Sequence, residues 1–196
     1  MARPRIGLAT GWAQPVLEER QSSSTWQGGA IADVEIAPKL RVEATLLYQK
    51  TNLSAYKSSS LGNQVWIPNP GSDFWLKYWE IENLRALIYG IQFKYTLPFL
   101  KNAHPYLGLG ARGISVLPFE VEYEFHKYNS STKLQEYARS KPHTKWQGMT
   151  LALGAEKQIG DTWAIGLEGL WLKNWEREPH VLNQQLGVSA KIYYLF

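Results

Sequence analysis

The sequence has no cysteine and no long apolar run. Without cysteine, the chain can form neither a disulfide framework nor a cysteine metal site. No segment approaches the roughly 18 apolar residues that a transmembrane helix needs. Only four histidines occur, no metal-ligand pair stands at helical or hairpin spacing, and no glycine-rich phosphate loop is present. We therefore expect no metal site and no cofactor.

The charge is also modest and evenly spread. The formal net charge is +4 and the pI is near 9.2, but Lys and Arg do not gather in one stripe, so we expect no nucleic-acid partner. The mean hydropathy of −0.32 suits a soluble protein. It also suits a transmembrane barrel, in which apolar and polar residues alternate and the average stays low. The 9 Trp and 11 Tyr favour a membrane interface, although a soluble β protein with an aromatic core remains an alternative.

Alternation with a period of two recurs eight times, which predicts strands. In the clearest case, from Leu107 to Phe125, every charge falls on the even positions. Short connections around Pro38, over 98–104 and at Gly160-Asp161 alternate with four longer ones. This arrangement is typical of outer-membrane barrels, with the termini and short turns on the periplasmic side. The pattern predicts an all-β fold: an eight-stranded antiparallel up-and-down transmembrane β-barrel, with residues 1–196 as a single domain.

The charges indicate which face of each strand meets lipid. An Arg or Lys on the lipid face costs roughly 2–4 kcal/mol at the membrane midplane, whereas an eight-stranded barrel has an interior just wide enough for side chains. We therefore expect the charged face to form a closed ionic network in the lumen rather than a diffusion pore. A soluble barrel would have the opposite polarity. The predicted lumen residues are Asp33, Glu35, Arg41, Glu43, Lys94, Arg112, Glu156, Glu168 and Lys191.

The C-terminal stretch 188–196 resembles the closing strand of Gram-negative outer-membrane proteins, with an aromatic residue at the end and apolar residues at alternate positions. The segment 105–113 resembles a strand of small barrels of the outer-membrane protein A and X type. The resemblance implies an outer-membrane location, contact with membrane lipid and lipopolysaccharide, and a signal peptide removed from the exported chain. It also implies recognition by the outer-membrane assembly machinery, through Val188, Ala190, Ile192, Tyr194 and Phe196.

One surface feature predicts a partner. The outer half of the strand 107–125 keeps apolar residues on the lipid side beyond the reach of the bilayer, and the preceding long loop is rich in aromatics. An exposed apolar patch usually marks a binding site. Two alternatives are that loops fold over the patch, or that Pro118 introduces a bulge that resets the alternation. The predicted partner-binding residues are Trp75, Trp79, Phe119, Val121, Tyr123 and Phe125.

The sequence thus favours a non-catalytic structural or interaction protein, such as a subunit of a larger envelope complex. A lipid A acyl hydrolase or transferase is the first alternative, with His126 as base, Glu124 as orienting acid and Ser115 as nucleophile. No motif supports these roles, so we expect no enzyme activity. A soluble ligand-binding barrel of the lipocalin kind is the second alternative.

Overall fold

The computed structural model describes residues 4–15, 21–56, 69–98, 103–140, 143–174 and 184–196. No helix in this described part is long and apolar enough to cross a membrane. The strands are β1 (Pro4–Pro15), β2 (Gln21–Ala37), β3 (Leu40–Tyr56), β4 (Phe74–Thr96), β5 (His104–Val116), β6 (Glu120–Lys127), β7 (Lys133–Arg139), β8 (His143–Ile159), β9 (Trp163–Asn174) and β10 (Gln184–Leu195).

Eight of these strands close into a barrel. They pair in the order β3-β2-β1-β10-β9-β8-β5-β4, and the pairing of β3 with β4 completes the circle. Every neighbouring pair is antiparallel. The first and last strands meet along a continuous register from Arg5 opposite Leu195 to Pro15 opposite Gln185. The predicted eight-stranded antiparallel barrel is confirmed.

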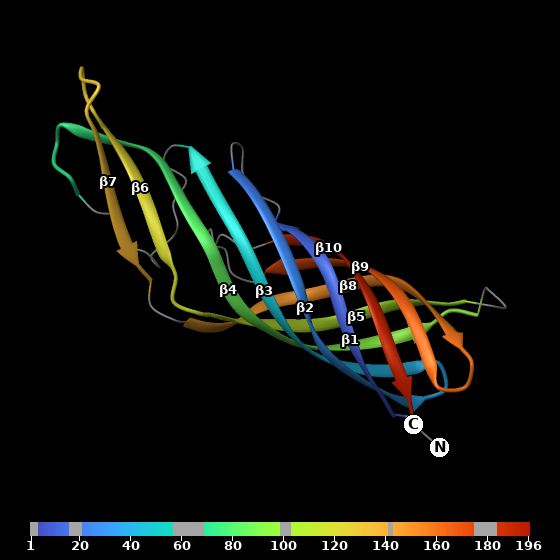
Figure 1. Cartoon of the computed structure of the whole chain (residues 1–196). Coiled ribbons are helices and arrows are strands. Elements are labelled where there is room, and N and C mark those ends of the chain that lie inside the picture. Colours follow the sequence, from blue (N-terminus) through green and yellow to red (C-terminus); the bar gives the residue numbers. More distant parts are fainter. Residues whose placement is uncertain (1–3, 16–20, 57–68, 99–102, 141–142, 175–183) are drawn as a thin grey trace.

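The β2–β3 turn, the β8–β9 turn, the end of β4 and the start of β5 lie at the same end of the barrel as the start of β1 and the C-terminus (Figure 1). Lys39 closes the β2–β3 turn with φ 67°, and Gly160 closes the β8–β9 turn with φ 63°. Positive φ costs glycine nothing, so Gly160 suits its turn. We call this the terminal end and the opposite one the loop end.

Beyond the loop end, the sheet continues as an extension. The last residues of β4, from Ala86 to Thr96, pair with β5. Its first residues, from Phe74 to Glu80, pair instead with β6, which pairs with β7. Figure 1 shows this hairpin projecting away from the end where the termini lie. The prediction of one strand over 107–125 is therefore wrong, because the chain leaves β-structure at 117–119 and β6 moves to a different part of β4.

Burial alternates along the barrel strands with apolar residues outside. Leu8, Phe93, Leu107 and Leu153 are each about half exposed or more, while charged residues on the opposite face are buried. A soluble barrel would bury the leucines and expose the charges, so the structure contradicts the lipocalin-like alternative. The polarity is that of a transmembrane barrel.

Aromatic residues border the apolar outer band at both ends. Near the loop end, Trp12 lies opposite Trp26. Near the terminal end, the rings of Trp163 and Tyr194 meet edge-on, 5.2 Å apart. Along β9, the span from Trp163 to Trp171 is close to the roughly 9–11 residues that a tilted strand needs to cross a bilayer. The outer surface thus has an apolar band between two aromatic girdles.

Candidate functional site in the barrel interior

One network of ion pairs and hydrogen bonds fills the terminal half of the interior. It begins at Arg41, which pairs with Asp33, and Asp33 also accepts two hydrogen bonds from Arg5. Arg5 Nη1 donates to Glu156 Oε2 at 2.6 Å. Lys94 Nζ lies 3.6 Å from Glu156 Oε1, so it links this part to the rest of the network.

Glu43 is the centre of the second part. Its side chain is fully buried, and its oxygens accept from Lys94 Nζ at 2.6 Å and Lys191 Nζ at 2.7 Å. Tyr193 Oη donates to it as well, at 2.6 Å. Lys191 continues to Glu168 at 2.8 Å. Two carboxylate oxygens can satisfy three donors in this way, so a buried charge keeps its partners.

The network takes at least one side chain from each of the eight barrel strands. Tyr106 of β5 joins by donating to Glu168 Oε2 at 2.9 Å. Since antiparallel strands can slide only by changing these partners, the network fixes the register of all eight strands at once. One member from each strand, in the order of the chain, is Arg5, Asp33, Glu43, Lys94, Tyr106, Glu156, Glu168 and Lys191.

The structure places the nine predicted lumen residues on the inner face. Eight have buried or largely buried side chains, and Glu35 is half-buried at the terminal mouth beside Arg41. Arg5 was not predicted, although its position two residues before Gly7 puts it on the inner face of β1. Tyr106 and Tyr193 were not predicted either, because a tyrosine on the polar face gives no signal of which carboxylate it reaches.

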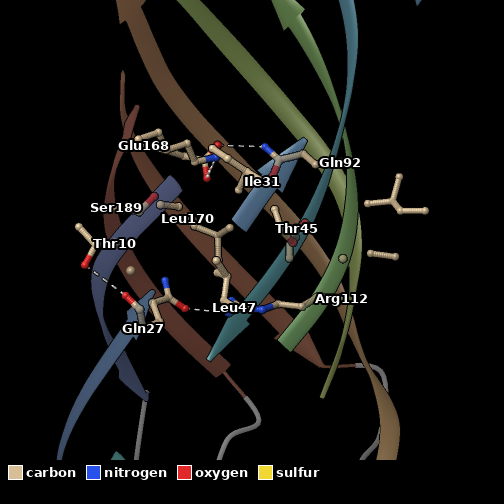
Figure 2. Close-up of a pocket in the computed structure, with 17 residues that line it drawn as sticks. Thr10, Gln27, Ile31, Thr45, Leu47, Gln92, Arg112, Glu168, Leu170 and Ser189 are labelled. Atoms are coloured by element: carbon tan, nitrogen blue, oxygen red, sulfur yellow. Dashed lines mark hydrogen bonds and ion pairs between the residues drawn. The ribbon is translucent and has the colours of Figure 1, made fainter. Parts of the chain in front are cut away.

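The loop half of the interior differs from the expectation of a polar lumen throughout. Here Ile31, Leu47, Ile88 and Ile114 are buried from four different strands. Between this apolar part and the network lies a cavity of about 40 Å³. Figure 2 shows Arg112 and Gln27 at one end of the cavity, and Glu168 and Gln92 at the other. The interior is therefore filled by salt bridges in its terminal half and by aliphatic side chains in its loop half.

A wider cavity of about 300 Å³ opens near the terminal end. Its lining includes Arg5, Glu35, Arg41, Lys94 and Glu156. The network forms the inner boundary of this vestibule, so the vestibule does not continue as a channel.

The predicted exposed apolar surface on the extension is wrong. Trp79, Phe119, Val121, Tyr123 and Phe125 are all at most 8% exposed and belong to one apolar cluster that continues the barrel interior. Two changes of alternation cause this. Glu82 and Asn83 form a bulge in β4, with Asn83 at φ 58°, and the irregular residues 117–119 reset the alternation between β5 and β6. The alternative in which Pro118 resets the alternation is the one that the structure shows.

Trp75, the sixth predicted partner-binding residue, is half-buried. Its ring lies 5.5 Å from that of His126. The neighbouring outer face of the extension is polar: Tyr78 donates to Glu80 at 2.6 Å, and Gln135 donates to Glu122 at 3.1 Å.

The residues considered for catalysis do not come together. His126 Nε2 lies 2.6 Å from Glu124 Oε1, and this hydrogen bond lowers the pKa of the Glu124 carboxyl, with Lys133 and Lys77 adding to the effect. Ser115, however, pairs with Leu87, whereas His126 pairs with Trp75. Along β4 these positions are roughly 40 Å apart at ~3.3 Å per residue, so Ser115 cannot act as a nucleophile for His126.

Of the five predicted assembly-signal residues, Val188, Ala190, Ile192 and Tyr194 lie on the outer face of β10, and Phe196 follows the end of that strand. Val188 and Phe196 are 59% and 65% exposed. Tyr194 contacts the rings of both Trp163 and Phe196. Within the described residues, no group of three or more His, Asp or Glu side chains is placed to hold a metal ion.

No protein-family model matches the sequence, and no curated protein sequence matches it. Among solved structures, the chain is similar to the N-terminal β-barrel domain of Pseudomonas aeruginosa OprF, with a TM-score of 0.49 and 8% identity over 100% of both chains. It is also similar to Neisserial surface protein A, with a TM-score of 0.46 and 14% identity over 100% of this chain and 97% of that one. Ail, the attachment invasion locus protein of Yersinia pestis, has a TM-score of 0.45 and 10% identity over the same shares. The closed circle of eight antiparallel strands, with apolar side chains outside and charged side chains inside, gives the chain the architecture of a small eight-stranded outer-membrane barrel.

Proposed function

We propose that this protein is a closed, non-catalytic barrel of the bacterial outer membrane that holds the β4–β6–β7 extension outside the bilayer for contact with an envelope protein. The ionic network that joins all eight barrel strands is the observation that carries the proposal. It leaves no continuous path for solutes, so the barrel serves as an anchor. The apolar band between the aromatic girdles contacts lipid and lipopolysaccharide.

A solute-permeability measurement tests the closed barrel. The full chain, reconstituted in phospholipid vesicles, is expected to leave small sugars trapped inside, whereas a general porin releases them. Release by the unaltered protein at a rate like that of the porin would contradict the proposal.

The network should also carry much of the stability. Glu43→Ala leaves Lys94 and Lys191 without their shared carboxylate, and removing one partner of a buried pair costs roughly 3–5 kcal/mol. We expect its urea midpoint to fall well below that of Glu82→Ala, a matched change at an exposed position of β4.

Partner contact is proposed for the outer face and free edge of the hairpin. β7 pairs with β6 on one side, and on the other side it pairs with no strand in the part of the chain that the structure describes. A free edge is a ready template for an added strand. Lys133 and Arg139 are exposed at the two ends of β7, so they favour an extended partner segment with acidic residues. A second copy of β7 fits less well, because antiparallel pairing of two copies about Glu136 would place like charges opposite each other.

A photo-crosslinking residue at Tyr137, which is 63% exposed, is expected to capture one defined envelope protein in intact outer membranes. The same residue at Pro98, exposed at the terminal end, is the control. Capture that is equal at the two positions, or absent at Tyr137, would rule out the hairpin as the contact surface.

The lipid A acyl hydrolase or transferase remains the alternative function. It predicts release or transfer of acyl chains by the purified protein, with loss of the activity in His126→Ala. We expect no activity in the unaltered protein, because Ser115 of β5 and His126 of β6 pair with distant points of β4.

A further inference from the structure

Arg112 is a buried cation with a neutral partner. It extends from β5 into the barrel and is 4% exposed. Its Nη2 donates to Gln27 Oε1 at 2.8 Å. A guanidinium carries five N–H donors and no acceptor. Among the described residues no carboxylate lies within ion-pair distance of Arg112, so most of its hydrogen-bonding capacity is left for whatever fills the adjoining cavity.

The other interior charges neutralise one another. Asp33, Glu43, Glu156 and Glu168 each lie within ion-pair distance of at least one of Arg5, Arg41, Lys94 and Lys191. Glu168, which lines the same cavity as Arg112, is taken up by Lys191, Tyr106 and Gln92. Figure 2 shows it at the far end of the cavity. Among the described interior cations, Arg112 is thus the one with no carboxylate within ion-pair distance, and Glu168 attracts it only from across the cavity.

An isolated buried charge costs several kcal/mol unless it is paired. Four hydroxyl groups line the same cavity. That of Thr10 donates to the Gln27 backbone oxygen at 3.5 Å, and those of Thr45, Thr150 and Ser189 can each turn the O–H toward an acceptor. The volume of about 40 Å³ holds about three water molecules at ~10–15 Å³ each. Such a space admits a halide ion with its remaining water, but it excludes a large organic anion such as gluconate.

We propose that the cavity beside Arg112 binds a small monovalent inorganic anion, chloride or one of similar size. The anion is held by the Arg112 guanidinium and by the hydroxyls of Thr45, Thr150 and Ser189. It supplies the counter-charge that the interior lacks at this level, so it stabilises the folded barrel. This site is independent of any partner on the extension.

Bromide diffraction tests the site directly. Crystals of the full chain grown in sodium bromide are expected to show an anomalous peak within hydrogen-bonding distance of the Arg112 guanidinium. The peak is expected to be lost in Arg112→Gln and kept in Arg139→Gln, a matched change at an exposed arginine of β7. Absence of a peak in the cavity of the unaltered protein would overturn the proposal.

Solution stability gives a second readout, which also serves if Arg112→Gln does not fold. At constant ionic strength, the unaltered barrel in detergent is expected to unfold at a higher temperature in chloride or bromide than in gluconate, since a ligand of the native state stabilises it by mass action. Thr150→Val is expected to reduce this difference and Arg139→Gln to preserve it. Equal unfolding temperatures in the two salts, or an undiminished difference in both variants, would show that no specific anion site exists.

Discussion

Tyr123 shows at the scale of one residue how the extension differs from the barrel wall. Its side chain is fully buried, and its hydroxyl has no hydrogen-bond partner among the described residues. It lies opposite Trp79, whose Nε1 is in the same situation, and its ring stacks on that of Phe125. Burial without a partner disfavours the charged phenolate and raises the pKa of Tyr123 to about 12.

This raised pKa makes hairpin stability depend on pH. In an open hairpin the phenol ionises near its ordinary pKa of about 10, while the packed hairpin keeps its proton until about pH 12. The contribution is therefore fully present below pH 10 and is lost as the pH rises to 12, where the opening constant is higher by ~10- to ~100-fold.

The ¹³Cζ signal of labelled Tyr123 measures both its titration and the opening in urea at pH 8 and pH 11. The signal is identified by its loss in Tyr123→Phe. The Phe variant, which lacks the unpaired hydroxyl, is expected to show no extra destabilisation at pH 11 and to be as stable as the unaltered protein or more so at pH 8. A titration midpoint near 10 would mean that Tyr123 is solvated.

At the scale of elements, β4 has two roles along its length. Its C-terminal part is a strand of the barrel between β3 and β5, and its N-terminal part pairs with β6. The bulge at Glu82 and Asn83 separates the two, and Asn52 Oδ1 accepts from the Asn83 backbone N–H at 3.0 Å. The bulge turns Trp79 and Ile81 inward, so the apolar cluster continues from the barrel into the extension.

Because β6 and β7 pair with the barrel strands only through the N-terminal part of β4, we expect the hairpin to open independently of the barrel. Val121 is fully buried in β6, and Val121→Asp places an unpaired charge in that cluster, at a cost on the order of 3–5 kcal/mol. We expect trypsin to cleave at Lys133 and Arg139 much faster in this variant, while the barrel keeps its heat-modifiable mobility on gels.

Glu120→Ala, next to Val121 but exposed, is the control and should cleave like the unaltered protein. Unchanged cleavage in Val121→Asp would show that the cluster does not hold the hairpin. Loss of the barrel itself would show that the two parts fold as one unit.

At the scale of the whole molecule, the outer surface is an apolar band and the interior is ionic. Leu153 lies on the outer face of β8 and is 62% exposed. It is at mid-depth, because Lys157 marks one side of the band and Lys173, opposite Met149, marks the other. Leu153→Arg is expected to lower the unfolding free energy in phospholipid vesicles by roughly 2–4 kcal/mol. Met149→Arg, nearer the loop-end rim, should cost less, and equal costs at the two depths would contradict the transmembrane orientation.

The sequence alone predicted the barrel class and, for a chain in lipid, which face of each strand is outside; only the structure excluded a soluble barrel of opposite polarity. Period-two alternation with charges confined to one side admits a single arrangement in lipid, because a charge such as Glu168 is too costly on the outer face. The nine predicted lumen residues follow from this local rule, which needs only the parity of each position within its own strand.

The tertiary structure decided which residues meet and where the alternation changes. Glu43 reaches Lys191, distant along the chain, through barrel closure, which no single strand encodes. The inward orientation of Trp79 depends on a bulge in β4, and that of Tyr123 depends on the irregular segment before β6. The hairpin of β6 and β7 can join the sheet only because β4 extends beyond the residues that pair with β5. A single inserted residue reverses every side chain after it, so parity read along a chain holds only as far as the next irregularity.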